Sequence, residues 1–237
     1  MKLFTRYARF MRLGYKALHP GWRADTRGAP EGAAVYLIHH QNMFGPVHFL
    51  GLWPKENRMW SLHVFYNRAL CFDQFYRYTF RERFGWHKLP AFCLAKLLSY
   101  IVPPVLRAFA VIPVYRGEAN LLTVRASMDA LLSGKSVSLC PDIAYASSDP
   151  AMGEIYTGFL MLGALYYKKT GQALPFVPVY ISKRKRVILL GPPETMEMDA
   201  SLPRAVRDEM GRRITAAVNR LGQACGDIVS KSQNRSV

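Results

Sequence analysis

The chain has 237 residues, half of them hydrophobic, with 32 Lys and Arg against 16 Asp and Glu, which gives a net charge of +16. This length suits one domain with a full core, and so strong a positive charge implies an anionic partner such as a lipid surface, nucleic acid or a phosphorylated substrate. The four cysteines lack the spacing of zinc ligands, so we expect a reduced chain with no metal site.

Residues 1–26 form the first predicted segment. Apolar residues recur there at three- and four-residue steps, and lysines and arginines fill much of the rest. The pattern predicts a basic amphipathic helix that associates with an anionic membrane. A surface helix packed on the core fits the same pattern equally well.

Strands and helices are predicted to alternate across residues 27–227. The predicted strands are 33–40, 58–65, 109–117, 135–142, 174–182 and 185–193. The predicted helices are 67–88, 91–101, 118–134, 155–171 and 201–225. The order indicates an α/β fold: a single domain with a mostly parallel central sheet flanked by helices. The tail, residues 228–237, is predicted to be disordered.

The longest apolar stretch, residues 89–115, carries Lys96, Arg107 and the pair Pro103–Pro104. These residues argue against a classical transmembrane helix, although a helix that lies on or dips into a membrane remains compatible with them. The two prolines are expected to end the helix that precedes them.

Three predicted strands end in polar residues: His39 and His40, Arg116, and Asp142. In parallel sheets, chemistry collects beyond the carboxyl ends of the strands. A histidine there can act as a general base, an arginine can hold a phosphate through two parallel hydrogen bonds, and an aspartate can orient a basic or hydroxyl group. Each residue alone also fits a structural role, as a strand-end hydrogen bond, a surface ion pair or a loop cap.

Four stretches follow one another in a recognisable order: HHQNMFGP, VIPVYRG, CPDIAYAS and FVPVYI. Together they resemble the four motif blocks of the glycerolipid acyltransferase superfamily, typified by 1-acylglycerol-3-phosphate O-acyltransferase, over roughly residues 33–193. The resemblance implies an O-acyltransferase of the phospholipid biosynthesis type. It would move a fatty acyl group from acyl-CoA or acyl-carrier protein to a glycerol-phosphate or lysophospholipid hydroxyl, with no cofactor besides that thioester.

The resemblance also implies roles for individual residues. His40 corresponds to the general base and Asp142, where the family has glutamate, to a second catalytic residue, while Arg116 corresponds to the phosphate ligand. The implied substrate-binding residues are Asn42, Gly45, Arg116, Pro141, Tyr145 and Gly158. Pro178 belongs to the fourth block.

Gly45 departs from the family pattern, because the family has an aspartate five positions after the catalytic histidine. Such a carboxylate holds the imidazole in the tautomer that a base needs. Either Asp73 or Asp142 replaces it through the fold, or a backbone carbonyl orients His40, or the chain is catalytically weak. His39 is expected to point to the opposite face, since neighbours on a strand alternate, unless the motif frame is shifted by one.

Three functional hypotheses follow. The first is an acyltransferase at the cytoplasmic face of a membrane, peripheral or monotopic, whose partners are an anionic membrane surface, a glycerolipid acceptor and an acyl thioester donor. The second is a non-catalytic lipid- or membrane-binding relative. The third, a nucleic-acid binder, is suggested by charge and aromatic content alone and lacks any recognisable module, so we expect no nucleic acid.

Overall fold

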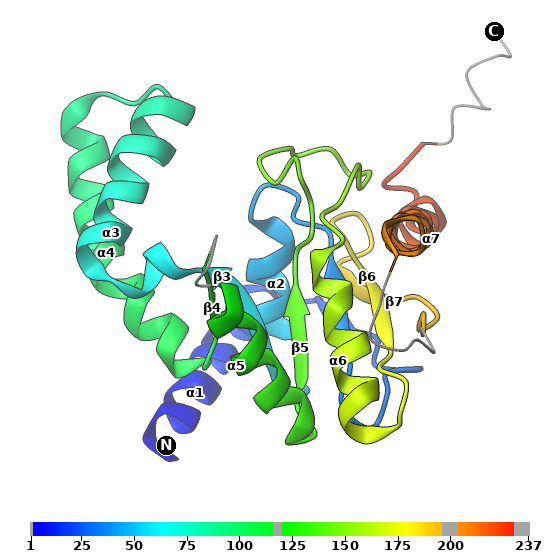
Figure 1. Cartoon of the computed structure of the whole chain (residues 1–237). Helices are drawn as coiled ribbons and strands as arrows, with labels where there is room; N and C mark the ends of the chain where they lie inside the picture. The colour runs from blue at the N-terminus through cyan, green and yellow to red at the C-terminus, as the bar shows by residue number, and fades with distance from the viewer. Residues whose placement is uncertain (1, 116–119, 196–202, 230–237) are drawn as a thin grey trace, which may run out of the picture. The chain divides into compact units, whose positions relative to one another are not determined.

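A computed structural model of the chain describes residues 2–115, 120–195 and 203–229, with side chains from residue 6 onward. The expected α/β class is confirmed: mostly parallel strands are flanked by helices (Figure 1). The chain divides into two compact units. The smaller holds residues 1–11 and 58–126, and the larger holds residues 12–57 and 127–237.

Five strands are described in the larger unit. They are β1 (Arg23–Ala24), β2 (Val35–Ile38), β5 (Ser136–Leu139), β6 (Phe176–Ser182) and β7 (Val187–Leu190), in the spatial order β1-β7-β6-β2-β5. β2 pairs in parallel with β5 on one side and β6 on the other, whereas β6 and β7 form an antiparallel pair. Every residue of β2, β5 and β6 is buried, which explains their unbroken apolar runs.

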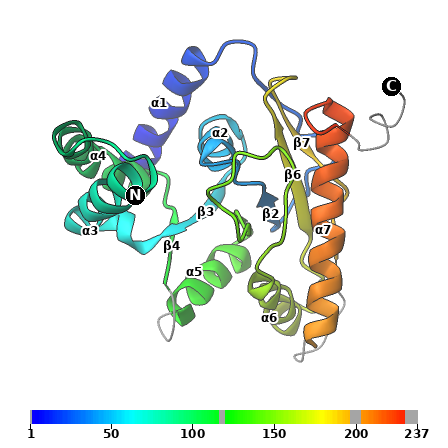
Figure 2. The same cartoon turned by 90° about the horizontal axis from the view of Figure 1, so that it is seen from above.

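The helices of this unit cover the sheet. They are the end of α1 (Lys2–Leu18), α2 (Phe44–Leu52), α6 (Met161–Thr170) and α7 (Arg204–Cys225). α7 packs along β6, as Figure 2 shows. α2 was not predicted from the sequence, although Pro46 in its first turn is a residue that helix starts favour. Phe49 and Trp53 stack on each other and both contact the ring of Tyr36 where α2 packs against β2, and all three are fully buried.

The smaller unit is built around a helical hairpin. A parallel pair, β3 (Asn57–Leu62) and β4 (Ile112–Val114), frames two arms. The first arm is α3 (Arg68–Asp73) continued by a π-helical segment (Gln74–Arg83), and the second is α4 (Lys88–Ala108). The remaining helix, α5 (Asn120–Leu132), begins in this unit.

The predicted helix end at Pro103–Pro104 is wrong, because α4 continues through both prolines to Ala108. Tertiary contacts hold this part of α4 in place. Pro103 is buried, and the Arg107 guanidinium donates a hydrogen bond of 2.7 Å to the carbonyl of Tyr66, which anchors the final turn. Packing therefore outweighs the tendency of proline to end a helix.

Alanine substitutions at two helical glycines test the contact between α1 and α2. Gly51 lies so close to the ring of Tyr15 that a Cβ atom would overlap it, whereas Gly14 has open space around it. We expect Gly51→Ala to lower the free energy of unfolding by about 1–3 kcal/mol through overpacking. Gly14→Ala should raise it by up to about 1 kcal/mol because alanine favours helices. Denaturant unfolding of both variants measures the difference, and equal effects would contradict the contact.

Candidate functional site

A left-handed turn joins β2 to α2. Its three residues have positive φ angles: 43° at Gln41, 52° at Asn42 and 73° at Met43. Residues other than glycine rarely adopt this left-handed backbone conformation. Hydrogen bonds close the turn: the amide of Phe44 donates to the carbonyl of Gln41 and that of Gly45 to the carbonyl of His40. Local strain of this kind persists only where surrounding contacts enforce it, and it often marks a functional site.

His39 and Asp142 form a buried pair at the adjacent carboxyl ends of β2 and β5. His39 Nδ1 lies 2.5 Å from Asp142 Oδ1, and both side chains are only 4% exposed. The other carboxylate oxygen, Oδ2, accepts a hydrogen bond of 3.0 Å from the backbone amide of His40. Asp142 therefore fixes both histidines of the first motif, one through its ring and one through its main chain.

The second ring nitrogen of His39 is also occupied. Nε2 lies 2.8 Å from the backbone carbonyl of Asp149. A carbonyl oxygen only accepts hydrogen bonds, so Nε2 must carry a proton. His39 is then either an imidazolium beside an ionised Asp142, or a neutral ring that accepts a proton from a protonated Asp142. In both states the pair as a whole carries no net charge.

The pairing differs from the sequence expectation. Asp142 was a candidate to orient the ring of His40, but it bonds the ring of His39, which was expected to point away. The reason is that β2 ends at Ile38. His39 and His40 lie beyond the strand, where side chains no longer have to alternate between the two faces of the sheet.

The ring of His40 is half-buried and lies edge-on to Tyr145, with 6.0 Å between ring centroids. Its Nδ1 accepts a hydrogen bond of 3.1 Å from the amide of Met43. In a neutral imidazole this places the proton on Nε2. The outer nitrogen of His40 is therefore a hydrogen-bond donor in this arrangement, suited to a phosphate or an oxyanion.

Gly45 is buried, and a Cβ atom there would overlap the backbone carbonyl oxygen of His39. Position 45 consequently has no room for the aspartate that the family pattern places there. The glycine allows the first turn of α2 to approach the end of β2 closely, and the pairing carboxylate comes from Asp142 on the neighbouring strand end.

The other predicted site residues lie in different settings. Pro141 is buried, and its carbonyl accepts a hydrogen bond of 2.8 Å from the amide of Tyr156, while Asn42 is half-buried in the left-handed turn. Gly158 is exposed and begins a 3₁₀ turn, with no atom within 4 Å of its Cβ position. Arg116 lies outside the described residues. Asp73 belongs to the smaller unit, is exposed, and pairs with Arg77 at 3.1 Å.

The loop after Asp142 is tied to α7. Asn219 accepts a hydrogen bond of 2.8 Å from the amide of Met152 and donates one of 2.9 Å to its carbonyl. These bonds fix the segment that carries the Asp149 carbonyl. Neither Asn219 nor Asp149 was predicted to contribute, and only the doubled histidine hinted at a role for His39.

Cys140 lies directly before Pro141, next to the site. Burial, and secondarily the charge of Asp142, raise the pKa of the Cys140 thiol well above its ordinary value, so Cys140 is a poor nucleophile. Within the described residues, no group of three or more His, Cys, Asp or Glu could hold a metal ion.

Comparison of the chain with protein-family models, curated proteins and solved structures gave no match. The resemblance to glycerolipid acyltransferases thus remains a prediction from the sequence motifs.

Removing the shared carboxylate tests the pair. In Asp142→Ala, the ring of His39 and the amide of His40 both lose their buried hydrogen-bond partner, so we expect the free energy of unfolding to fall by about 3–5 kcal/mol. Asp149→Ala is the matched control, because the bond to His39 comes from its backbone, and it should cost less than about 1 kcal/mol. Denaturant unfolding distinguishes the two, and equal losses would contradict the pair.

Inserting the family aspartate tests the lack of room at position 45. We expect Gly45→Asp to lower the melting temperature strongly, because its Cβ meets backbone rather than a movable side chain. Asn42→Asp adds the same charge to the same loop at a position where aspartate tolerates the left-handed conformation, and it should melt close to the wild type. Differential scanning calorimetry provides the comparison; a stable Gly45→Asp protein would refute the packing argument.

Proposed function

We propose that the chain is an O-acyltransferase that moves a fatty acyl group from an acyl thioester to the hydroxyl of a glycerol-phosphate or lysophospholipid. One observation carries the proposal: a buried histidine–carboxylate pair lies where two adjacent parallel strands end. A carboxylate on Nδ1 is the arrangement that lets Nε2 of a histidine act as a base. The motif order described above supplies the substrate class.

In this proposal His39 is the base, which shifts the motif frame by one residue from His40. When the Asp149 carbonyl withdraws, Nε2 releases its proton to solvent, and a neutral His39 with its remaining proton on Nδ1 presents a bare Nε2 to the acceptor hydroxyl. Nε2 takes the hydroxyl proton while the oxygen attacks the thioester carbonyl. The carbon–sulfur bond then breaks, and the imidazolium returns the proton to the departing thiolate.

The neighbouring residues take supporting roles. Asp142 keeps the Nδ1 proton in place and stabilises the imidazolium, as the orienting carboxylate of a catalytic triad does. His40 donates from Nε2 to the developing oxyanion or to a substrate phosphate. Asn42 and Tyr145 lie in the turn and in the facing loop, and they remain candidates for substrate contact together with Arg116.

A second candidate function is a lipid-binding protein that has lost turnover. The bond between His39 Nε2 and the Asp149 carbonyl favours it, because that carbonyl occupies the position that an acceptor hydroxyl would need. The two functions differ in one respect: an enzyme must release this bond during turnover, whereas a binding protein keeps it.

Asp142→Asn separates catalysis from folding. An asparagine can donate to Nδ1 of His39 and still accept the amide of His40, which satisfies every buried group but fixes the proton of His39 on Nε2. We expect a folded protein whose thioester turnover falls by up to about 10⁴. Turnover is measured as thiol release from acyl-CoA with glycerol 3-phosphate or lysophosphatidate as acceptor.

Histidine variants complete the test. His39→Gln should lower turnover by about 10²–10⁴ through loss of the base. His40→Ala should cost about 10² through loss of one donor. His87→Gln, at the end of the helical hairpin, is the control and should behave as the wild type. Full turnover in His39→Gln with none in His40→Ala would assign the base to His40, and a wild type without turnover that still binds lipid would favour the binding protein.

A further inference from the structure

In the α3–α4 hairpin, α4 turns small side chains toward the other helix and several large apolar side chains toward the surface. The second arm, α4, buries small residues at every fourth position, namely Ala91, Ala95, Ser99 and Pro103. The other arm packs against this stripe through Phe80, with Phe72, Phe75 and Tyr76 around it. A helix in water normally turns its large apolar residues toward its partner, whereas small residues between helices are typical of packing within lipid.

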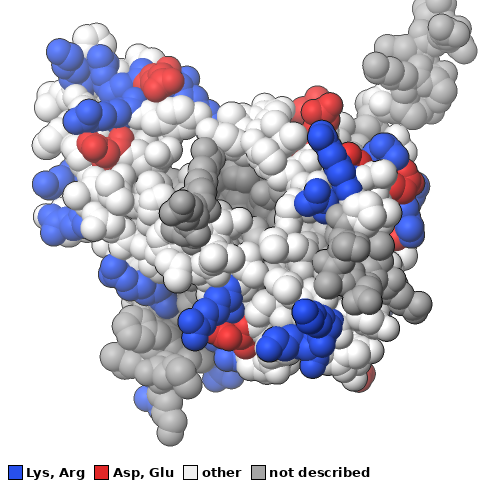
Figure 3. All heavy atoms as spheres, in the orientation of Figure 1, with Lys and Arg blue, Asp and Glu red and all other residues white. Residues whose placement is uncertain are grey.

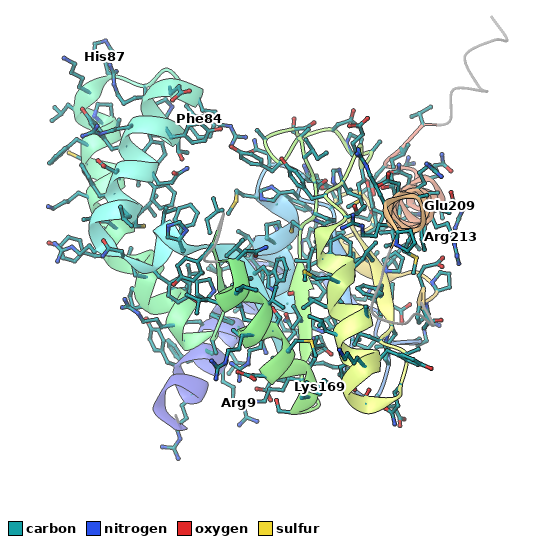
Figure 4. The ribbon with its side chains drawn as sticks, in the orientation of Figure 1. Arg9, Phe84, His87, Lys169, Glu209 and Arg213 are labelled. Atoms are coloured by element: carbon teal, nitrogen blue, oxygen red, sulfur yellow. The ribbon has the colours of Figure 1, made fainter. Side chains whose placement is uncertain are left out.

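Several large apolar residues of α4 face outward, although Leu94 and Leu98 pack inward against the Phe80 cluster. Leu89 is 74% exposed, Leu97 55% and Tyr100 50%. Phe92 and Ile101 are also exposed, and at the end of the hairpin Phe84 and Trp86 add two aromatic rings to the surface. Figure 4 shows Phe84 and His87 at this end. An exposed apolar surface of this extent marks a contact with another apolar phase.

Positive charge surrounds the apolar surface. Residues 67–108 hold seven Lys and Arg but only two Asp and Glu, and Figure 3 shows Lys and Arg gathered at the end of the hairpin. Arg68 lies over the ring of Tyr100, with 3.2 Å to the centroid, and Lys96 lies 5.9 Å from the ring centroid of Phe72. Such contacts let charged groups remain beside an apolar surface.

The hairpin is suited to lying in the membrane interface rather than crossing it. Among the described residues, α4 is the one helix with the length and composition to span a membrane. However, Lys96 lies at mid-helix on the exposed face, where a spanning orientation would place its charge in the hydrocarbon at high cost. An in-plane orientation lets that side chain extend to the headgroups.

We infer that the α3–α4 hairpin docks the protein on an anionic phospholipid bilayer, with the outer face of α4 and the aromatic end in the headgroup boundary. Charge complementarity favours lipid over a second copy of the chain, because two hairpins with the same net positive charge repel one another. This role is independent of the proposed acyl transfer, since it needs neither substrate nor the His39–Asp142 pair.

Vesicle co-sedimentation of the full chain tests the inference, without any acyl donor. Binding to vesicles that contain phosphatidylglycerol should exceed binding to pure phosphatidylcholine and weaken with salt. Leu89→Glu and Leu97→Glu should each reduce the partition coefficient by about tenfold to a hundredfold. Leu121→Glu is the matched control, because Leu121 on α5 is also 74% exposed, and it should leave the coefficient unchanged.

Phe10→Glu addresses the amphipathic N-terminal helix, whose exposed Phe10 makes it the rival docking element. Equal binding by wild type, Leu89→Glu and Leu97→Glu would overturn the inference, and a loss confined to Phe10→Glu would transfer docking to α1. A wild type that sediments as a dimer without lipid, and becomes monomeric in Leu89→Glu, would assign the surface to a second copy.

Trp86 offers an independent readout. Vesicles of brominated lipid should quench part of the tryptophan fluorescence, and Trp86→Phe should abolish that part because its ring lies at the exposed end of the hairpin. The variant keeps an aromatic ring to stack on Phe80, which lies 4.9 Å from Trp86 between centroids, so the fold is preserved. Quenching that persists in Trp86→Phe would contradict insertion of this end.

Discussion

The bond between His39 and Asp142 is the contact on which the candidate site depends. The two residues are 103 positions apart in the chain, and they meet because β2 and β5 lie side by side in parallel. A buried carboxylate is stable only when its oxygens are paired, and here one oxygen takes the ring of His39 and the other the amide of His40. The pair thus fixes the end of β2, the start of the turn and the end of β5 in one arrangement.

The turn after β2 follows from this constraint. Because His39 and His40 are both held by Asp142, the chain must reverse at once to begin α2, and three successive residues take left-handed backbone angles to do so. Gly45 completes the reversal, since its lack of a side chain lets the helix start against the carbonyl of His39. The glycine at position 45 and the carboxylate that the neighbouring strand supplies are therefore two aspects of one geometry.

The two units pose different physical problems. The larger unit buries apolar strands on both sides and gathers its polar groups at the strand ends, as a soluble α/β core does. In the hairpin of the smaller unit, α4 turns its small side chains inward and exposes several of its large apolar ones. That inversion is unfavourable in water and favourable against lipid, and the surrounding arginines and lysines match an anionic headgroup layer.

The sequence alone determined the α/β class, because apolar runs alternating with amphipathic segments specify buried strands and covering helices through local periodicity. It also placed His39, His40 and Asp142 at strand ends. Only the tertiary structure decided which histidine meets Asp142, because that choice depends on where β2 ends and how the turn bends. It likewise decided that α4 passes through Pro103 and Pro104, and that α2 starts at Phe44. These outcomes rest on contacts between distant segments, which outweigh local preferences of about 1–3 kcal/mol.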